Sequence, residues 1–239
     1  MGKKESTKDK TIKRKLNLKK VFFLVCFLLI VFLVVKFSLK IKVKEIYVDG
    51  NKFVTDKDII NSSGLDKNTI FLKFSARKVC NEVVKNPFIE TCKIKRDLSF
   101  AVRIVVTENA PVLLYFPESK VILSNGDKVN LDSQYGIPTL ISVVPEEVLD
   151  KFIVGLNKVN SDIIRSVSEI EYAPSVKNKG EYIDKERFML SMNDGNIVYI
   201  NIRNIEVLNN YTKIYASIGD KKGYYNLDSD FENYYFKEF

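Results

Sequence analysis

One long apolar run near the start of the chain dominates its hydrophobic pattern. Residues 21–35 carry no charged, hydroxyl or amide side chain, and the run continues through Lys36 and Ser38 to Leu39. As a helix, this segment would rise roughly 28 Å, since each helical residue adds about 1.5 Å. The hydrocarbon core of a bilayer is about 30 Å thick. The pattern therefore predicts a single transmembrane helix over residues 21–39.

Basic residues before this run predict its orientation. Residues 1–20 contain nine Lys or Arg against Glu5 and Asp9, a balance of +7 in a chain whose formal net charge is +8. Basic flanks stay on the cytoplasmic side of a membrane. Residues 1–20 are therefore predicted to be a cytoplasmic tail, with the rest of the chain outside the cell membrane. The four lysines from Lys36 to Lys44 weaken this bias without reversing it.

A cleaved signal peptide is the alternative interpretation of the apolar run. Such a peptide has a shorter apolar core and a small-residue cleavage site. This run ends in Val-Val-Lys-Phe-Ser-Leu-Lys, which contains no Ala-x-Ala-like triplet. An uncleaved anchor is favoured.

The basic excess lies beside the anchor, so residues 45–239 are slightly acidic. The high net charge therefore indicates membrane topology and contact with anionic lipid, and does not favour nucleic-acid binding.

Residues 41–110 predict a module with the order β-α-α-β-β. A strand over 43–48 is followed by a helix over 55–63, with Thr55 as its N-cap and Gly64 as its stop. Ser75 caps a second helix, whose apolar residues recur at helical spacing until Asn86 and Pro87 end it. Two strands follow over 89–96 and 99–107, where apolar and polar side chains alternate.

Residues 111–228 predict a mixed α/β module with a largely antiparallel sheet. The turns at 124–127 and 193–196 each separate two strand-like segments and predict hairpins. Residues 145–159 and 206–218 predict helices, residues 162–171 a helix followed by a strand, and residues 224–227 a closing strand. The fold class is therefore α+β, with an N-terminal transmembrane helix and two modules.

Residues 229–239 form an aromatic tail that follows the closing strand. Two interpretations stay open: the tail packs onto its own sheet or the membrane surface, or it joins a strand edge that is offered to a partner protein. Tyr and Phe give a large contact area for each immobilised side chain. Since alternate residues of a strand face opposite sides, half of the candidates can be core residues. The candidate partner-binding residues are Tyr224, Tyr225, Leu227, Tyr234, Tyr235 and Phe236.

The chain contains no histidine, which removes Ser-His and Cys-His nucleophiles and every His-ligated metal site. Cys80 and Cys92 are the two cysteines outside the membrane run, too few for a zinc site. Both occupy predicted core-facing positions, so two buried thiols are the favoured expectation. A Cys80–Cys92 disulfide is the alternative in an oxidising compartment.

No other pattern indicates catalysis, a cofactor or a small-molecule substrate. The acidic pairs Glu146–Glu147, Glu169 with Glu171, and Asp228 with Asp230 stand at helix starts or strand ends, where solvated charge is the ordinary explanation. Asp228-Ser229-Asp230 lacks the Gly and the distal Glu of a calcium loop. We expect neither a catalytic residue nor a metal or cofactor site.

A series of short phrases, in a fixed order and spacing, gives the chain a resemblance to a known family. The phrases are Val-Lys-Glu-Ile-Tyr-Val-Asp-Gly-Asn51, Asp58-Ile-Ile, Gly64-Leu65, Asn68-Thr-Ile-Phe-Leu72, Asn86-Pro-Phe-Ile89, Lys95-Arg96 and Val106-Thr-Glu-Asn-Ala-Pro-Val112. They resemble the FtsQ/DivIB family of bacterial division proteins, whose first outer module is a POTRA (polypeptide-transport-associated) domain. Asn109 departs from the Glu-Arg-x-Pro usual in the family, and Asn226 stands where an Asp is more common.

This resemblance implies a non-catalytic divisome scaffold with a POTRA domain at 41–110 and an FtsQ/DivIB-type β domain at 111–228. It implies partners among single-pass coiled-coil division proteins of the FtsB/DivIC and FtsL kinds, docked at the closing sheet, and enrichment at the septum. A membrane-anchored POTRA-type chaperone or secretion factor is the alternative function. An anchored wall enzyme would need a catalytic constellation that the sequence does not display.

Overall fold

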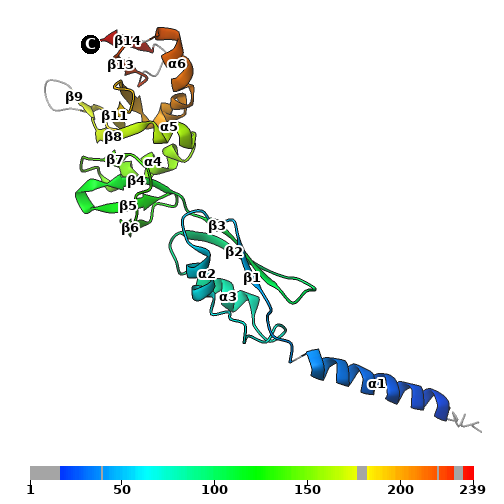
Figure 1. Cartoon of the computed structure of the whole chain (residues 1–239). Coiled ribbons are helices and arrows are strands. Elements are labelled where there is room, and N and C mark those ends of the chain that lie inside the picture. The colour runs from blue at the N-terminus through cyan, green and yellow to red at the C-terminus, as the bar shows by residue number, and fades with distance from the viewer. Residues whose placement is uncertain (1–16, 39, 177–181, 220, 229–233) are drawn as a thin grey trace, which may run out of the picture.

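The computed structural model describes residues 17–38, 40–176, 182–219, 221–228 and 234–239 (Figure 1). The predicted cytoplasmic tail falls mostly on residues 1–16 and therefore lies outside the described residues, as do Leu39 and Phe231. From one end to the other, the molecule consists of a separate helix, a small α/β module and a larger module built on a sheet (Figure 1).

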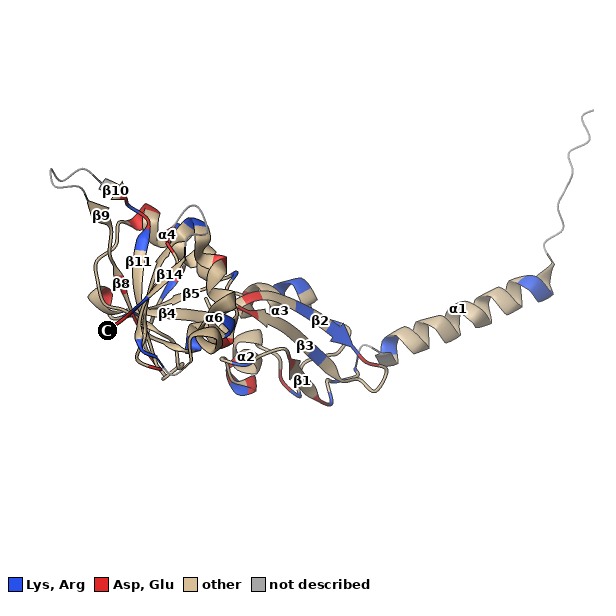
Figure 2. Ribbon diagram, turned by 90° about the horizontal axis from the view of Figure 1, so that it is seen from above, with Lys and Arg blue, Asp and Glu red and all other residues tan. Residues whose placement is uncertain are grey.

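The separate helix is α1, Leu18–Ser38, which begins three residues before the predicted start at residue 21. The stretch Leu18–Phe37 has a mean hydropathy of 2.8, and no part of it is buried inside the protein. Figure 2 shows basic residues near the ends of α1 and an uncharged stretch between them. By length and composition, α1 is a single helix able to cross a membrane.

The first module has the predicted order β-α-α-β-β. Its sheet has the strand order β1-β3-β2, in which β1 pairs parallel to β3 and β2 pairs antiparallel to it. The two helices pack on this sheet around a buried apolar cluster that includes Ile59, Val79 and Ile104. The elements are β1 (Ile46–Asp49), α2 (Asp56–Ser63), α3 (Ala76–Val83), β2 (Ile89–Arg96) and β3 (Val102–Glu108).

Local capping chemistry accounts for both helices of this module. The Thr55 side chain accepts a hydrogen bond from the backbone N–H of Asp58 at 3.2 Å, and Gly64 ends α2 in the left-handed conformation with φ 65°. Ser75 caps α3 by accepting from the N–H of Lys78 at 3.4 Å. The third strand starts later than predicted because Phe100 has φ 65°, which interrupts the extended backbone before Val102.

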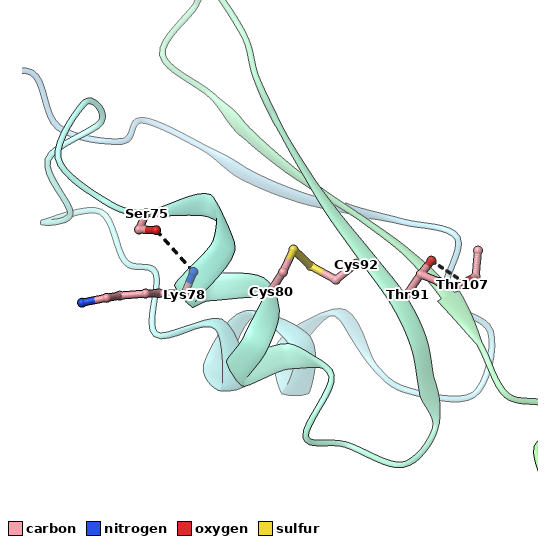
Figure 3. Close-up of a disulfide and its surroundings, with 6 residues drawn as sticks. All are labelled: Ser75, Lys78, Cys80, Thr91, Cys92 and Thr107. Atoms are coloured by element: carbon pink, nitrogen blue, oxygen red, sulfur yellow. Dashed lines mark hydrogen bonds between the residues drawn. A yellow bond between two sulfur atoms is a disulfide. The ribbon is translucent and has the colours of Figure 1, made fainter.

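A disulfide joins Cys80 on α3 to Cys92 on β2 (Figure 3). The favoured expectation of two buried thiols was therefore wrong. The packing of α3 on β2 brings the two Cα atoms to 5.3 Å, within the usual range of about 4.4–6.8 Å for a disulfide. Both residues are half-buried at the edge of the apolar cluster, so the bridge ties the helix to the rim of the sheet.

The second module is built on a nine-stranded sheet with the order β14-β13-β12-β11-β8-β7-β4-β5-β6. Parallel pairing occurs at β4–β7, β7–β8 and β12–β13, and the other neighbours pair antiparallel. The sheet is thus largely antiparallel, as predicted. Its strands are β4 (Pro111–Tyr115), β5 (Lys120–Leu123), β6 (Lys128–Asn130), β7 (Thr139–Leu140), β8 (Val167–Tyr172), β11 (Arg187–Met192), β12 (Ile197–Asn201), β13 (Gly223–Asn226) and β14 (Tyr235–Glu238).

Helices cover one face of this sheet and form the larger core with it. The rings of Phe152 on α4 and Phe188 on β11 are stacked with centroids 3.8 Å apart. The segment 206–218 was predicted as one helix, but residues 202–210 form a 3-10 helix and the α-helix begins at Tyr211. The covering elements are α4 (Glu146–Leu156), α5 (Ser161–Arg165), η2 (Ile202–Asn210) and α6 (Tyr211–Ile218); the short η1 (Phe116–Glu118), β9 (Ser175–Val176) and β10 (Tyr182–Asp184) complete the module.

Candidate docking edge at the C-terminal sheet

The aromatic tail contributes the last strand of the large sheet. β14 pairs antiparallel with β13, with Tyr224 opposite Lys237 and Tyr225 opposite Phe236. The sheet therefore continues past residue 228, where the sequence favoured a boundary, and β13 is an inner strand. Among the described strands, β14 has a neighbour on one side only.

The alternation of an antiparallel ladder indicates which backbone groups of β14 face its free side. The N–H of Phe239 donates to the carbonyl oxygen of Lys222 at 3.2 Å. Since residues that bond to the partner strand alternate with residues that do not, Lys237 and Tyr235 also bond toward β13. The N–H and C=O groups of Phe236 and Glu238 consequently face outward, in position to pair with an added strand.

The inner face of β13 and β14 is part of the core. The ring of Tyr225 packs against Phe236, with centroids 4.9 Å apart, and against Tyr211 at 5.6 Å. Burial raises the pKa of Tyr225, and its hydroxyl has no hydrogen-bond partner among the described residues. Burial, followed by the hydrogen bond to Asp194, raises the pKa of Tyr211. These side chains therefore hold the edge against α6 and stay neutral at physiological pH.

A polar cluster fixes the start of β13 against the β11–β12 hairpin. Asn196 is 1% exposed, and its side-chain oxygen accepts from the N–H of Gly223 at 3.0 Å. Its amide nitrogen donates to the hydroxyl of Tyr211 at 3.2 Å, and that hydroxyl donates to Asp194 at 2.7 Å. The Asn-Asp-Gly-Asn turn that marks the hairpin in the sequence thus also positions the edge strands.

The outer face of the same strands carries a row of aromatic rings, which we call the aromatic strip: Tyr199 on β12, Tyr224 on β13, and Phe239. Tyr224 is stacked on Tyr199 with centroids 6.2 Å apart, and Phe239 meets Tyr224 edge-on at 5.0 Å. Arg187 extends the strip, with its guanidinium carbon 4.0 Å from the centre of the Tyr199 ring. The Arg187 Nε atom donates to Asp228 at 2.5 Å, so this arginine is held in place.

The six candidate residues divide between core and surface. Tyr225 and Leu227 are each 1% exposed and belong to the core, because strand alternation turns them toward α6. Tyr224, Tyr234 and Phe236 are half-buried. Tyr235 is 61% exposed, and Phe239 is 64% exposed. Direct contact with a partner stays a prediction for the exposed and half-buried members.

Sequence reasoning missed Tyr199 and Arg187 as parts of this surface. Both precede the closing strand by more than twenty residues in the sequence, and they reach it through the parallel pairing of β12 with β13. The strand itself was predicted from the turn at residues 193–196, but no local signal indicated that its neighbour would be the closing strand.

The acidic candidates are not drawn together by the fold. Asp228 pairs with Arg187, and the other two residues of Asp228-Ser229-Asp230 lie outside the described residues. Glu147 pairs with Lys151 on its own helix. Within the described part of the chain, no group of three or more carboxylates or thiols is placed to hold a metal ion.

A cavity of about 550 Å³ lies where the two modules meet. Phe53 and Glu108 of the first module line it, together with Tyr135 and Ile164 of the second. Both oxygens of Glu108 already accept hydrogen bonds from backbone N–H groups of residues 52–54. The acidic group of this cavity is therefore engaged in holding the β1–α2 loop.

Residues 41–109 match the family model for the POTRA domain, FtsQ-type. The chain is 29% identical over 207 residues to the cell division protein DivIB of Brevibacillus brevis, which covers 83% of this chain and 76% of that protein. It is 25% identical over 167 residues to DivIB of Bacillus anthracis, covering 68% and 61%.

The chain thus has an FtsQ-type POTRA domain and resembles DivIB proteins over most of its length. Its match to DivIB of Enterococcus faecalis extends over 232 residues at 27% identity, or 92% of this chain and 59% of that relative. The chain thus spans about three fifths of the length of several of its DivIB relatives.

Solved structures that match the chain include the major extracytoplasmic domain of the trans isomer of the bacterial cell division protein DivIB from Geobacillus stearothermophilus. The sequence identity is 20% and the TM-score is 0.37, over 47% of this chain and 95% of the other. At this score the likeness adds nothing to that resemblance.

Proposed function

We propose that this protein is a non-catalytic divisome scaffold that recruits or stabilises partner division proteins at the septum and helps to regulate septal peptidoglycan synthesis. The resemblance to DivIB proteins supports a role in cell division, because the relatives are named cell division proteins. Within this proposal, both modules act through binding surfaces, and the chemistry of wall synthesis belongs to other proteins.

In this proposal α1 crosses the cell membrane with the lysine-rich N-terminus in the cytoplasm and both modules outside. Tethering confines the search for membrane-bound partners to two dimensions and raises their effective concentration. Protease treatment of intact protoplasts tests the orientation. Digestion of the modules with survival of the basic tail supports it, and the reverse pattern refutes it.

The observation that carries the proposal is the free edge of β14 beside the aromatic strip. The outward backbone groups of Phe236 and Glu238 can pair with a strand of the partner, while Tyr235 and Phe239 offer apolar contact area next to that strand. The partners that fit are single-pass coiled-coil division proteins of the FtsB/DivIC and FtsL kinds. A short extended segment beyond their coiled coil would add to the sheet.

The variant Glu238→Pro tests strand addition with little disturbance of the fold. Proline removes the outward N–H of residue 238, and it is tolerated on edge strands whose N–H faces solvent. The matched control is Glu238→Ala, which also loses the ion pair of Glu238 with Lys221 at 3.0 Å but keeps the N–H. Each variant replaces the wild-type protein in cells, and its co-purification with the coiled-coil partners is measured together with septum formation.

We expect Glu238→Pro to lose most of the co-purified partner and to give filamentous cells, while Glu238→Ala behaves like the wild type. Thermal unfolding of both purified proteins shows that they are folded. Full partner recovery and normal septa with Glu238→Pro refute docking at this edge. Normal septation with a secretion defect after depletion of the protein favours the chaperone alternative instead.

A further inference from the structure

The loop between β2 and β3 lies at the end of the first module that faces α1. The chain leaves the membrane helix and enters β1, which runs parallel to β3 with Ile46 opposite Val102. The starts of both strands therefore lie toward α1, and residues 97–101, which precede β3, lie at that same end of the module. Figures 1 and 2 both show this loop pointing toward the end of the module that α1 joins.

Two backbone hydrogen bonds tie this end of the first module to the chain segment that follows α1. The N–H of Val43 donates to the carbonyl oxygen of Thr69 at 2.9 Å, and the N–H of Lys44 donates to that of Phe100 at 3.1 Å. Val43 is six positions after Phe37, the last residue of the apolar span, and six residue steps reach at most about 20 Å. Val43 therefore lies within roughly that distance of the end of the apolar span, and Thr69 and Phe100 are hydrogen-bonded to this short segment.

The tip of the β2–β3 loop presents an apolar side chain to solvent. Leu98 is 97% exposed, and Leu72 on the neighbouring loop is 52% exposed. The turn is internally bonded: the N–H of Ser99 donates to the Asp97 carboxylate at 3.1 Å, and the N–H of Phe100 donates to the Asp97 carbonyl oxygen at 3.0 Å. This hydrogen-bonded turn leaves Leu98 exposed at the tip of the β2–β3 loop.

The segments beside these two leucines carry several basic side chains, and none of them forms an ion pair with a described acidic residue. Arg96 lies on the ring of Phe74, at 4.2 Å from its centre, and Lys44 lies over the ring of Phe100 at 5.3 Å. The exposed cations are Lys42, Lys44, Lys67, Lys73, Lys95 and Arg96, against the exposed acids Glu45, Asp66 and Asp97.

We propose that this end of the first module rests on the bilayer that α1 crosses, with Leu98 inserted among the headgroups and the surrounding cations bound to anionic lipid phosphates. Apolar side chains rimmed by lysine and arginine are the composition that binds such interfaces. The occupant is the bilayer surface because the tether keeps this patch beside it and because its uncompensated charge matches anionic headgroups. The contact would fix the tilt of the module and direct β14, at the opposite end of the molecule, away from the membrane.

An environment-sensitive fluorophore at position 98 of the full-length protein tests the contact. Both labelled proteins carry Cys26→Ser, which removes the free thiol and keeps the Cys80–Cys92 disulfide. Adding Leu98→Cys then gives a protein with one reactive thiol, at position 98. Val143→Cys is the matched control, because Val143 is an apolar residue that is 74% exposed in the second module. Both proteins are reconstituted into nanodiscs of phosphatidylcholine, with or without phosphatidylglycerol, and quenching by the neutral solute acrylamide is measured.

We expect quenching at position 98 to be several-fold weaker than at position 143 in discs that contain phosphatidylglycerol. The difference should shrink in pure phosphatidylcholine, and also when Lys42, Lys44 and Lys95 are replaced together by glutamine. Equal quenching at the two positions in the anionic discs overturns the proposal. Protection at position 98 that is independent of both lipid charge and the three lysines overturns it as well.

Discussion

Gly223 lies so close to Lys237 that a Cβ atom on Gly223 would stand 2.2 Å from the Lys237 carbonyl oxygen. The same atom would stand 2.8 Å from the ring of Phe236. Both neighbours belong to β14, so the absence of a side chain at residue 223 allows the edge strand to reach β13. The docking edge thus depends on a glycine whose role is close approach.

The variant Gly223→Ala should therefore loosen β14. Forcing a methyl group against a backbone carbonyl typically lowers the free energy of unfolding by about 1–3 kcal/mol. Thermal unfolding gives the loss of stability, and hydrogen exchange at residues 235–238 shows whether the strand detaches. Thr212→Ala on the exposed face of α6 is the control, with no expected change. A wild-type melting temperature and full protection of β14 in Gly223→Ala would contradict the assigned role of this glycine.

Glu108, at the end of β3, gives a second prediction. One carboxylate oxygen accepts from the N–H groups of Lys52 and Phe53 at 2.7 and 2.9 Å, and the other accepts from Val54 at 2.9 Å. Removing the carboxylate leaves three backbone donors of the β1–α2 loop without a protein acceptor. Glu108→Ala should lower the free energy of unfolding by about 1–3 kcal/mol, measured by denaturant titration.

Glu108→Gln keeps one acceptor oxygen and should lose less stability than the alanine variant. The control is Glu90→Ala on the neighbouring strand, because Glu90 is exposed and accepts only the Thr107 hydroxyl, at 3.2 Å, in a described bond. Equal stability of Glu108→Ala and Glu90→Ala would show that solvent replaces the carboxylate without loss.

Local sequence signals predicted the elements that local chemistry determines. Thr55 and Gly64 bracket α2, and Ser75 starts α3, because their side chains or their conformational freedom satisfy the helix ends directly. The turn at Asn193–Asn196 likewise gave the β11–β12 hairpin. The alternation of apolar and polar residues predicted the strands β2 and β3, which pair antiparallel in the structure.

Contacts between distant segments could not be predicted in the same way. The parallel pairing of β12 with β13 requires the chain to return across η2 and α6, and this crossover places Tyr199 beside Tyr224. The predicted contact residues therefore included Tyr225 and Leu227, which belong to the core, and partner contact by the others stays a prediction. The aromatic tail had two open interpretations, because composition does not say whether an exposed strand pairs with its own sheet.

The disulfide between Cys80 and Cys92 gives a third prediction. The two residues are 12 apart in the sequence, and closing a loop of about that length in the unfolded chain corresponds to roughly 3 kcal/mol of stabilisation. Reduction should therefore lower the denaturant midpoint of the wild-type protein. The variant with both residues replaced by serine should show that lower midpoint already and respond no further to reductant. Cys26→Ser should respond to reductant as the wild type does.

Tyr211 gives a prediction for alkaline pH. Burial, and then the hydrogen bond to Asp194, raises its pKa in the folded protein, whereas the unfolded chain has a tyrosine pKa of about 10. The folded state holds this proton more tightly, so the stabilisation is complete below about pH 10 and is lost as the pH rises above that value. Unfolding midpoints measured from about pH 8 to about pH 11 should therefore fall steeply at the alkaline end.

Tyr211→Phe separates this titration from the general effect of alkali on lysines. The variant loses the hydrogen bonds to Asp194 and Asn196, which should lower the free energy of unfolding at pH 8 by about 1 kcal/mol. It should also lose less stability above about pH 10 than the wild type does. Part of the pH-dependent loss should remain, because burial also raises the pKa of Tyr225. Tyr235→Phe, at an exposed position, should keep the wild-type slope. If Tyr211→Phe shows that same slope, the buried hydroxyl is not the group whose ionisation unfolds this module.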